Sequence, residues 1–259
     1  MMRSMARVAP FLAALCCLGA DARAGPLINV DFNAGLSPTY SGAAVLGTAG
    51  DAWNGIVVNS AGGASNLALV DSSGMGSGVT LSYNTPSMSV GGFSIFGSPL
   101  SPFQGTAYAS LMQDYLYVIP SMGPATTTFS GLTAGGTYRL ILYSSADSIA
   151  PGQARGRDTG FTVHGVTEHV VQGSDSAFVE GSNYADFTAA ADPLGNLSFT
   201  TQGFPYVPSP AFPDFTRSEG NLNGMQLSAV PEPSTLAMFG FASLWIAIGA
   251  LCRRFRERP

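Results

Sequence analysis

The alternation of apolar and polar residues constrains the fold of this chain more than any other feature of its sequence. Between the two ends of the 259-residue chain, no run of twelve residues shows the 3.6-residue apolar period of an amphipathic helix. Short runs of β-branched and aromatic residues recur instead, and glycine, proline and asparagine separate them. The runs predict roughly ten strands, at residues 27–32, 78–83, 115–119, 125–129, 137–144, 160–164, 168–171, 176–179, 184–189, 196–201 and 222–230. This pattern predicts an all-β protein with a jelly-roll-like β-sandwich.

The alternation also predicts which side chains are buried. Tyr138, Leu140 and Leu142 share one face of their strand. The glycine-rich turn at residues 131–136 resembles the turn that precedes a tyrosine corner, in which a tyrosine hydroxyl holds a connection between two sheets. We therefore expect a structural role for Tyr138.

The first residues of the chain have the features of a secretory signal peptide. Two arginines precede the apolar residues 8–20, which are too few to span a bilayer, and Ala22 and Ala24 supply the small side chains that signal peptidase requires. These features predict a signal peptide at residues 1–24, cleaved before Gly25. A lipoprotein signal is the weaker alternative, because neither cysteine of this segment follows a suitable small residue.

A second apolar segment lies near the C-terminus. Residues 235–252 are 18 residues without a charge, about the minimum for a membrane-spanning helix. A tail at residues 253–259 follows and contains four arginines: Arg253, Arg254, Arg256 and Arg258. By the positive-inside rule, this tail stays in the cytoplasm and the body of the protein is exported. A plain C-terminal anchor is the simplest interpretation.

The residues before this segment allow a more specific interpretation. Pro231, Glu232 and Pro233 precede the apolar run and the arginine cluster, and this order at residues 230–259 resembles the PEP-CTERM sorting signal of exported bacterial proteins. The resemblance implies processing by an exosortase, a membrane transpeptidase, in a Gram-negative-type envelope. It also implies release or attachment at the surface, often alongside exopolysaccharide. Two prolines favour an extended, unpaired segment that a processing enzyme can bind.

The exported body, residues 25–229, is free of cysteine and strongly acidic. All three cysteines lie in the terminal segments, so the body forms no disulfide and must be stabilised by its core. Its four arginines and 13 acidic residues give a net charge of −9, and the chain contains no lysine. Such a surface repels nucleic acid and anionic lipid headgroups, whereas paired carboxylates can hold a hard cation such as calcium.

The body also resembles a recurrent family of PEP-CTERM-associated sandwich proteins of environmental bacteria. The residues that carry this resemblance are 28–32, 50–54, 114–116, 131–138, 178–184 and 218–227. The resemblance implies a fold related to carbohydrate-binding sandwiches and no established activity.

A search for catalytic and metal-binding motifs gives no candidate. His164 and His169 are separated by four residues, one more than the zinc-protease patterns allow, and Gly165 favours two strands around a turn. We therefore expect solvent-facing histidines and no zinc site. The sequence lacks a Gly-x-Ser-x-Gly motif, a phosphate-binding loop and a dinucleotide fingerprint. A pair of acidic residues for glycoside hydrolysis is permitted by the composition but is not indicated by a motif.

One aromatic residue suggests glycan binding. Trp53 is the only tryptophan of the body, and it lies near Asp51 and Asn54 in a Gly-, Ala- and Ser-rich stretch, residues 34–77, that is predicted to be a long loop. An aromatic face with carboxylate and amide groups nearby suits a sugar ring, so these three residues are candidate glycan contacts. The alternative is that Trp53 is a core residue beneath the loop.

Three further features complete the predictions. Asp31, Asp51 and Asp71 are candidates for a structural calcium site, with turn capping as the alternative. Residues 147–158 are predicted to form a solvated hairpin loop. The proline-rich residues 204–215 are expected to form a second long loop.

Together these features predict an exported, non-catalytic β-sandwich protein without a catalytic residue or cofactor. We expect a membrane-anchored precursor that an exosortase processes, followed by a structural or adhesive role at the cell surface or in the extracellular matrix. Exopolysaccharide is the expected glycan partner, and nucleic acid is excluded by charge. The alternative is a secreted carbohydrate-active enzyme, such as a lyase or an esterase.

Overall fold

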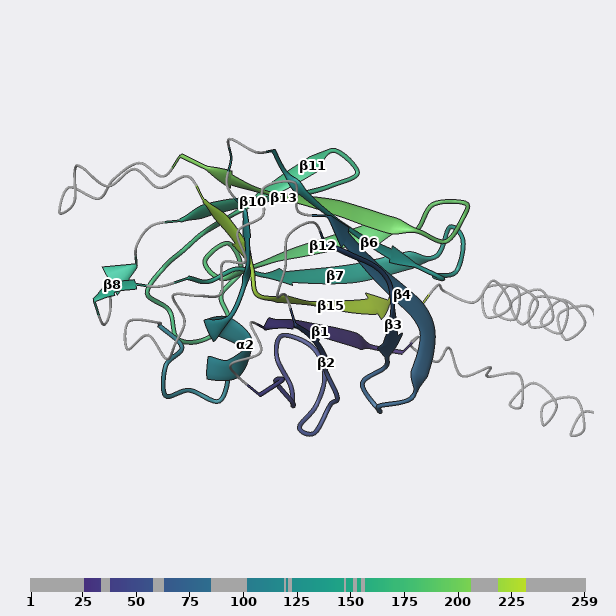
Figure 1. Ribbon diagram of the computed structural model, residues 1–259, viewed down its shortest axis with the longest axis horizontal. Coiled ribbons are helices and arrows are strands. Elements are labelled where there is room, and N and C mark those ends of the chain that lie inside the picture. Colours follow the sequence, from purple (N-terminus) through teal and green to yellow (C-terminus); the bar gives the residue numbers. More distant parts are fainter. Residues whose placement is uncertain are drawn as a thin grey trace, which may run out of the picture. The chain divides into compact units, whose positions relative to one another are not determined.

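Most of the described strands belong to two large β-sheets (Figure 1). The computed structural model describes residues 26–33, 38–57, 63–84, 102–118, 120, 123–146, 148–150, 153–154, 157–205 and 219–231. Residues Gly25–Val230 form one compact unit. The predicted all-β, jelly-roll-like sandwich is confirmed.

The first large sheet has five strands in the order β12-β7-β15-β1-β2. The strands are β12 (Tyr184–Ala190), β7 (Thr137–Tyr143), β15 (Gly224–Ala229), β1 (Ile28–Asn33) and β2 (Asn54–Val57). Neighbours pair antiparallel, apart from β2, which runs parallel to β1. The last strand of the body, β15, therefore lies inside this sheet, directly beside the first strand, β1.

The second large sheet has six strands in the order β11-β10-β13-β6-β4-β3, all paired antiparallel. The strands are β11 (Val166–Val171), β10 (Asp158–Val163), β13 (Leu197–Phe204), β6 (Ala125–Ser130), β4 (Gly76–Asn84) and β3 (Ala64–Val70). The smaller elements are the pair of β5 (Leu116–Val118) and β14 (Gly220–Leu222), the pair of β8 (Ser148–Ala150) and β9 (Gln153–Ala154), and the helix α2 (Ala109–Gln113).

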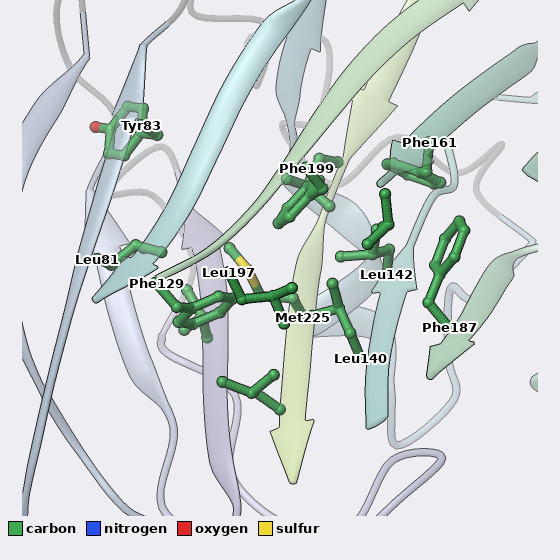
Figure 2. Close-up of a cluster of buried hydrophobic side chains, with 14 of the residues drawn as sticks. Leu81, Tyr83, Phe129, Leu140, Leu142, Phe161, Phe187, Leu197, Phe199 and Met225 are labelled. Atoms are coloured by element: carbon green, nitrogen blue, oxygen red, sulfur yellow. The ribbon is translucent and has the colours of Figure 1, made fainter. Parts of the chain in front are cut away.

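The main core lies between the two large sheets. Figure 2 shows that aliphatic and aromatic side chains from both sheets meet there, among them Leu140 and Met225 from one sheet and Phe129 and Phe199 from the other. Leu140 and Leu142 join this core together with Tyr138, so the predicted buried face of β7 is confirmed. Because period-two alternation puts successive side chains on opposite faces, this packing fixes the register of the strand.

A further layer covers the outer face of the five-stranded sheet. All six residues of β1 are buried, which requires cover on both faces. A second apolar cluster supplies that cover and contains Tyr40, Trp53, Phe103, Leu111, Met112, Ile141 and Tyr143. Residues 38–53 and the segment around α2 thus shield the face of the sheet that the main core does not cover.

The two ends of the sandwich differ in their connections. Tight turns at residues 71–75, 131–136, 164–165 and 191–196 join strands at one end, which we call the turn end. The longer connections, including those from β4 to β5, from β7 to β10 and from β13 to β14, join strands at the opposite end, which we call the loop end. The short pair of β5 and β14 lies at the loop end, because β14 directly precedes the start of β15.

Some sequence predictions are wrong in detail. Residues 176–179 do not form the predicted strand, because the side chain of Asn183 donates to Ala177 O and accepts from Val179 N and so holds a turn. The predicted loop at residues 34–77 contains β2 and β3. His164 lies in the two-residue turn between β10 and β11 and has a positive φ of 48°, followed by Gly165 at 81°. This conformation matches the right-handed twist of a hairpin and confirms two strands around a turn.

Candidate functional site

The chain leaves the sandwich at the turn end. Val230 N donates to Thr137 O at 2.8 Å, one residue beyond the end of β15. Pro231 has no N–H group and cannot continue this ladder. Both Val230 and Pro231 are exposed. The segment that contains the predicted sorting motif therefore begins where the backbone pairing of the sheet stops.

The chain also enters the sandwich at the turn end. Ile28 of β1 pairs with Leu227 of β15, so the start and the end of the body lie side by side. A recess of ≈ 170 Å³ lies between them and the turn before β7. Its lining is Pro26, Ile28, Ser77, Val79, Gly131, Leu132, Thr133, Tyr138, Leu227 and Ala229.

Tyr138 stabilises the turn between the two sheets. Its hydroxyl accepts a hydrogen bond of 2.9 Å from Thr133 N, within the connection that runs from β6 in one sheet to β7 in the other. Gly131 begins this turn with a φ of 85°, a conformation that favours glycine. The structural role predicted for Tyr138 is confirmed.

Trp53, the candidate for sugar stacking, is a core residue. Only 7% of it is exposed, and its Nε1 donates to Gly42 O at 2.9 Å. The indole packs edge-on against Tyr40, with ring centroids 5.1 Å apart, and lies 6.4 Å from the ring of Tyr143. A sugar stack requires an exposed ring face, and this indole is almost fully covered. The structure therefore supports the core interpretation and corrects the stacking hypothesis.

The other two candidate glycan contacts use their polar atoms within the protein. The carboxylate of Asp51 accepts hydrogen bonds from Thr48 N and Thr48 Oγ1, at 3.0 and 2.8 Å, and so closes a turn. The side chain of Asn54 donates to Asn29 O and Val70 O, at 2.8 and 2.9 Å, and accepts from Val70 N at 2.8 Å. Asn54 therefore connects β1, β2 and β3.

Asp31 is buried beneath the layer formed by residues 38–53. Its Oδ2 accepts a hydrogen bond of 2.8 Å from Tyr40 N, whereas its Oδ1 meets no hydrogen-bond partner in the described part of the chain. The pKa of Asp31 is raised to about 7, mainly by burial; the hydrogen bond from Tyr40 N opposes this rise, and the nearby charge of Asp114 adds to it. Asp31 is therefore a buried carboxylate that titrates near neutral pH.

The three aspartates proposed for calcium serve different local structures. The Oδ1 of Asp71 accepts from Ser73 N, Ser73 Oγ and Met75 N, which is the turn-capping alternative, and these bonds lower the pKa of Asp71. Asp51 closes its own turn and Asp31 is buried. Among the described residues, no group of three or more His, Cys, Asp or Glu side chains is placed to hold a metal ion.

His169 lies beside an open groove on the edge strand β11. Its Nδ1 is 2.7 Å from the Oδ1 of Asp158, and its ring centroid is 4.7 Å from that of Phe204. The groove has a volume of ≈ 490 Å³ and is lined by Glu168, His169, Glu180, Gly181 and Ala185. Burial raises the pKa of Glu168, and the nearby carboxylates of Glu180 and Asp186 raise it further. The groove thus brings two carboxylates and a solvent-accessible imidazole together.

A buried arginine lies at the loop end. Arg157 is only 2% exposed, although it belongs to the stretch predicted as a solvated hairpin, so that prediction is wrong for this residue. Its guanidinium carbon lies 5.3 Å from the ring centroid of Tyr115 and 5.7 Å from that of Tyr117. Within the described residues, its Nε and Nη1 have no hydrogen-bond acceptor. No local sequence pattern indicates this arrangement, because the arginine and the tyrosines are 40 residues or more apart.

The remaining predicted sorting residues lie outside the described residues. These are the signal-cleavage residues Ala22 and Ala24, the motif residues Glu232 and Pro233, the apolar segment 235–252 and the four arginines of the tail. Among the described residues, no helix has both the length and the apolar character needed to cross a membrane.

Comparison with protein families identifies the C-terminal segment. The model of the PEP-CTERM protein-sorting motif matches residues 229–256. The chain carries a PEP-CTERM sorting motif. It is therefore an exported, surface-targeted protein with a signal for exosortase processing. The match begins at the last residue of β15, which is where the sheet ends.

The comparisons with curated sequences and with solved structures do not identify the body of the chain. No curated protein sequence matches the chain. Among solved structures, the ANX2 ectodomain from Arabidopsis thaliana is 11% identical over 81% of this chain and 50% of its own, with a TM-score of 0.38. The plant receptor-like kinase FER is 14% identical over 80% and 43%, with a TM-score of 0.36. The chain spans about half the length of these structures, and likenesses at this level carry no inference about its function.

Proposed function

We propose that this PEP-CTERM protein is a non-catalytic structural or adhesive protein of the cell surface or the exopolysaccharide matrix. The observation that carries the proposal is the position of the sorting segment. It begins at the turn end of the sandwich, directly after Val230, whereas the long connections and the buried Arg157 lie at the loop end. A body attached through its C-terminus keeps its loop end remote from the attachment point, and loops on a rigid sandwich commonly carry binding sites.

The junction suits the processing that we propose. Exosortase handling requires access to the backbone near the motif, and Pro231 is exposed and lies outside the sheet. Before processing, residues 235–252 anchor the precursor in the inner membrane, with the arginine-rich tail in the cytoplasm. After processing, the body is released or attached at the surface.

The buried polar side chains of the described body support a structural role. Gln226 accepts hydrogen bonds from Tyr143 Oη and Leu46 N, and it donates to Asn29 Oδ1 and Leu46 O. These bonds attach the covering segment to the sheet. Satisfied buried networks of this kind make a fold rigid and specific, which suits a protein that works by remaining folded outside the cell.

The alternative, a secreted carbohydrate-active enzyme, has one observation in its favour. The groove beside β11 contains Glu168 and Glu180, and the raised pKa of Glu168 is a property of a general acid. Incubation of the body with exopolysaccharide from the producing strain tests this alternative. Release of reducing ends or unsaturated products by the native body, but not by Glu168→Gln, would establish an enzyme and overturn the non-catalytic proposal.

Cell fractionation tests the proposed function itself. We expect the full chain at the surface or in the matrix fraction, and a chain that ends at Val230 in the medium or the periplasm without surface association. A Leu194→Ala variant is a suitable control, because Leu194 is 83% exposed at the same end of the body. Equal surface association of the truncated chain would contradict a function that depends on the sorting segment.

A further inference from the structure

Small polar side chains form a continuous row across the outer face of the six-stranded sheet. The row takes one outward-facing residue from each of five adjacent strands, and successive members are register partners: Thr167, Thr162, Thr200, Thr126 and Asn84. Neighbouring strands lie about 4.8 Å apart, so the row is about 19 Å long. A shorter row runs beside it and contains Ser198, Thr128 and Ser82. This face of the sheet therefore presents an ordered set of hydroxyl groups.

These hydroxyl groups are accessible to solvent. Thr126, Thr167 and Ser198 are exposed, and Thr162 and Thr128 are partly exposed. Two pairs hold each other in place, because Thr162 Oγ1 lies 2.8 Å from Thr167 Oγ1, and Thr128 Oγ1 lies 2.8 Å from Ser198 Oγ. A hydroxyl has one donor and two acceptor positions, so each pair retains acceptor positions for a ligand.

This face differs in charge from the rest of the body. Among the described strands, β13, β6 and β4 contain no acidic or basic residue. The outward positions of β10 and β11 contain one acidic residue, Asp158, which lies beside His169 at a corner of the face. The body as a whole carries a net charge of −9, so it repels a polyanion and offers it no lysine or arginine on these strands. The face therefore suits an uncharged partner with many hydroxyl groups.

An aromatic ring lies on the same face, at the last residue of β13. The ring of Phe204 packs over Gly160 of the neighbouring strand, where an added β-carbon would lie 2.3 Å from Cε2 of the ring. Its centroid is 4.7 Å from that of His169, and Phe204 is partly exposed. Gln202, two residues earlier on β13, supplies an amide group on this face. An aromatic ring with amide and hydroxyl groups nearby suits a sugar, whose C–H face packs on the ring while its hydroxyls form hydrogen bonds.

We propose that the outer face of β11, β10, β13, β6 and β4 binds an uncharged polysaccharide chain, with Phe204 as the stacking residue and the threonine row as the source of hydrogen bonds. A row of about 19 Å is longer than one sugar ring, so it suits a chain of sugars. The source of the ligand, the surrounding matrix, rests on the proposed function, and the site gives the class of glycan that an adhesive body binds. Phe204 lies where β13 ends, at the loop end, so a body attached through its C-terminus keeps this part of the face accessible.

Binding of the isolated body, residues 25–230, to a panel of immobilised polysaccharides tests the face. This piece forms one compact unit with its own core, so it is suitable for measurement alone. The panel contains uncharged glucans, galactans, mannans and xylans, with alginate and pectin as acidic members. We expect binding to at least one uncharged member, with the same affinity at ~0.1 M and ~1 M NaCl, between which the Debye length falls from about 10 Å to about 3 Å. Absence of binding to every uncharged member, or salt-sensitive binding to the acidic members alone, would overturn the proposal.

Four variants locate the site. Phe204→Ala should weaken binding about tenfold, whereas Phe204→Tyr keeps the ring and should bind like the native body. Thr126→Val removes one exposed hydroxyl, retains the β-branched shape and should weaken binding about fivefold. Thr188→Val is the matched control, because Thr188 is also an exposed strand threonine but lies on β12 of the other large sheet, and it should bind like the native body.

Two other outcomes would overturn the proposal. Native affinity in both Phe204→Ala and Thr126→Val would show that the polysaccharide binds elsewhere on the body. A dimer of the native body that Phe204→Ala and Thr126→Val both dissociate, measured by sedimentation, would assign the face to a second copy of the chain. The Tm of each variant shows whether it is folded, and Thr126→Val tests the face even if Phe204→Ala does not fold. Because sorting is not involved, these outcomes are distinct from a failure of the body to reach the surface.

Discussion

Asn54 and Val70 join the two sheets, because the side-chain amide of Asn54 bonds to both the N–H and the C=O of Val70, as the backbone of a neighbouring strand would. The Oδ1 of Asn54 accepts from Val70 N at 2.8 Å, and its Nδ2 donates to Val70 O at 2.9 Å. Asn54 belongs to β2 in the five-stranded sheet, and Val70 ends β3 in the six-stranded sheet. This pair connects β2 and β3, which are edge strands of the two sheets. It also fixes the position of the start of β2, next to the layer that covers the outer face of the five-stranded sheet.

The first prediction concerns this pair. Asn54→Ala leaves the N–H and C=O of Val70 and the carbonyl of Asn29 without their partner, and unsatisfied groups of this kind cost about 1–3 kcal/mol. We expect a loss of roughly 2–3 kcal/mol in the free energy of unfolding, measured with urea on residues 25–230. Leu194→Ala is the control and should change stability by less than about 0.5 kcal/mol. A change of similar size in the free energy of unfolding of both variants would show that Asn54 does not stabilise the contact between the two sheets.

The second prediction concerns the environment of Trp53. The body contains Trp53 alone, since the second tryptophan of the chain is Trp245. Its buried indole should emit at short wavelength and resist quenching by acrylamide, and unfolding in urea should shift the emission to the red. Addition of soluble exopolysaccharide should leave the spectrum unchanged. A solvent-like emission, or quenching by saccharide, would restore the stacking hypothesis.

The third prediction concerns pH. Since burial raises the pKa of Asp31 from 3.8 to about 7, the folded state binds a proton more tightly than the unfolded state. The stability from this group is complete at low pH and is lost as the pH rises toward 7, by about 3 kcal/mol between pH 5 and pH 8. Asp31→Asn keeps an acceptor for Tyr40 N and carries no charge, so urea titrations at the two pH values should show this loss in the native body only. An equal slope in both proteins would assign the pH dependence to other groups.

The fourth prediction concerns the turn before β7. Tyr138→Phe removes the hydroxyl that accepts from Thr133 N and retains the buried ring. We expect a loss of about 1 kcal/mol. Hydrogen exchange should become faster at Thr133 N, while amides of β13 remain protected. An unchanged exchange rate at Thr133 would show that the hydroxyl does not hold this turn.

The sequence predicted the architecture well because strand alternation is a local signal. Leu140 and Leu142 were placed on the buried face of β7 from their spacing alone, and Tyr138 was assigned from its turn. β3 was missed because alanine, serine and asparagine dilute its apolar alternation. The burial of Trp53 depends on a covering segment that packs on a sheet formed by distant parts of the chain, and no local pattern indicates such packing. Arg157 was misplaced for the same reason, because its burial depends on tyrosines from another strand.

The central claim is that the PEP-CTERM motif delivers the protein to the surface, and changing that motif tests the claim most directly. Cells that produce the full chain should be fractionated, and the mass of the recovered protein should be determined, for the native sequence and for a variant with Pro231, Glu232 and Pro233 replaced by alanine. We predict that the native protein reaches the surface or matrix fraction with a mass that lacks the C-terminal segment. The variant should remain at precursor length in the inner membrane. A variant that reaches the surface with the same shortened mass as the native protein would contradict delivery by the PEP-CTERM motif.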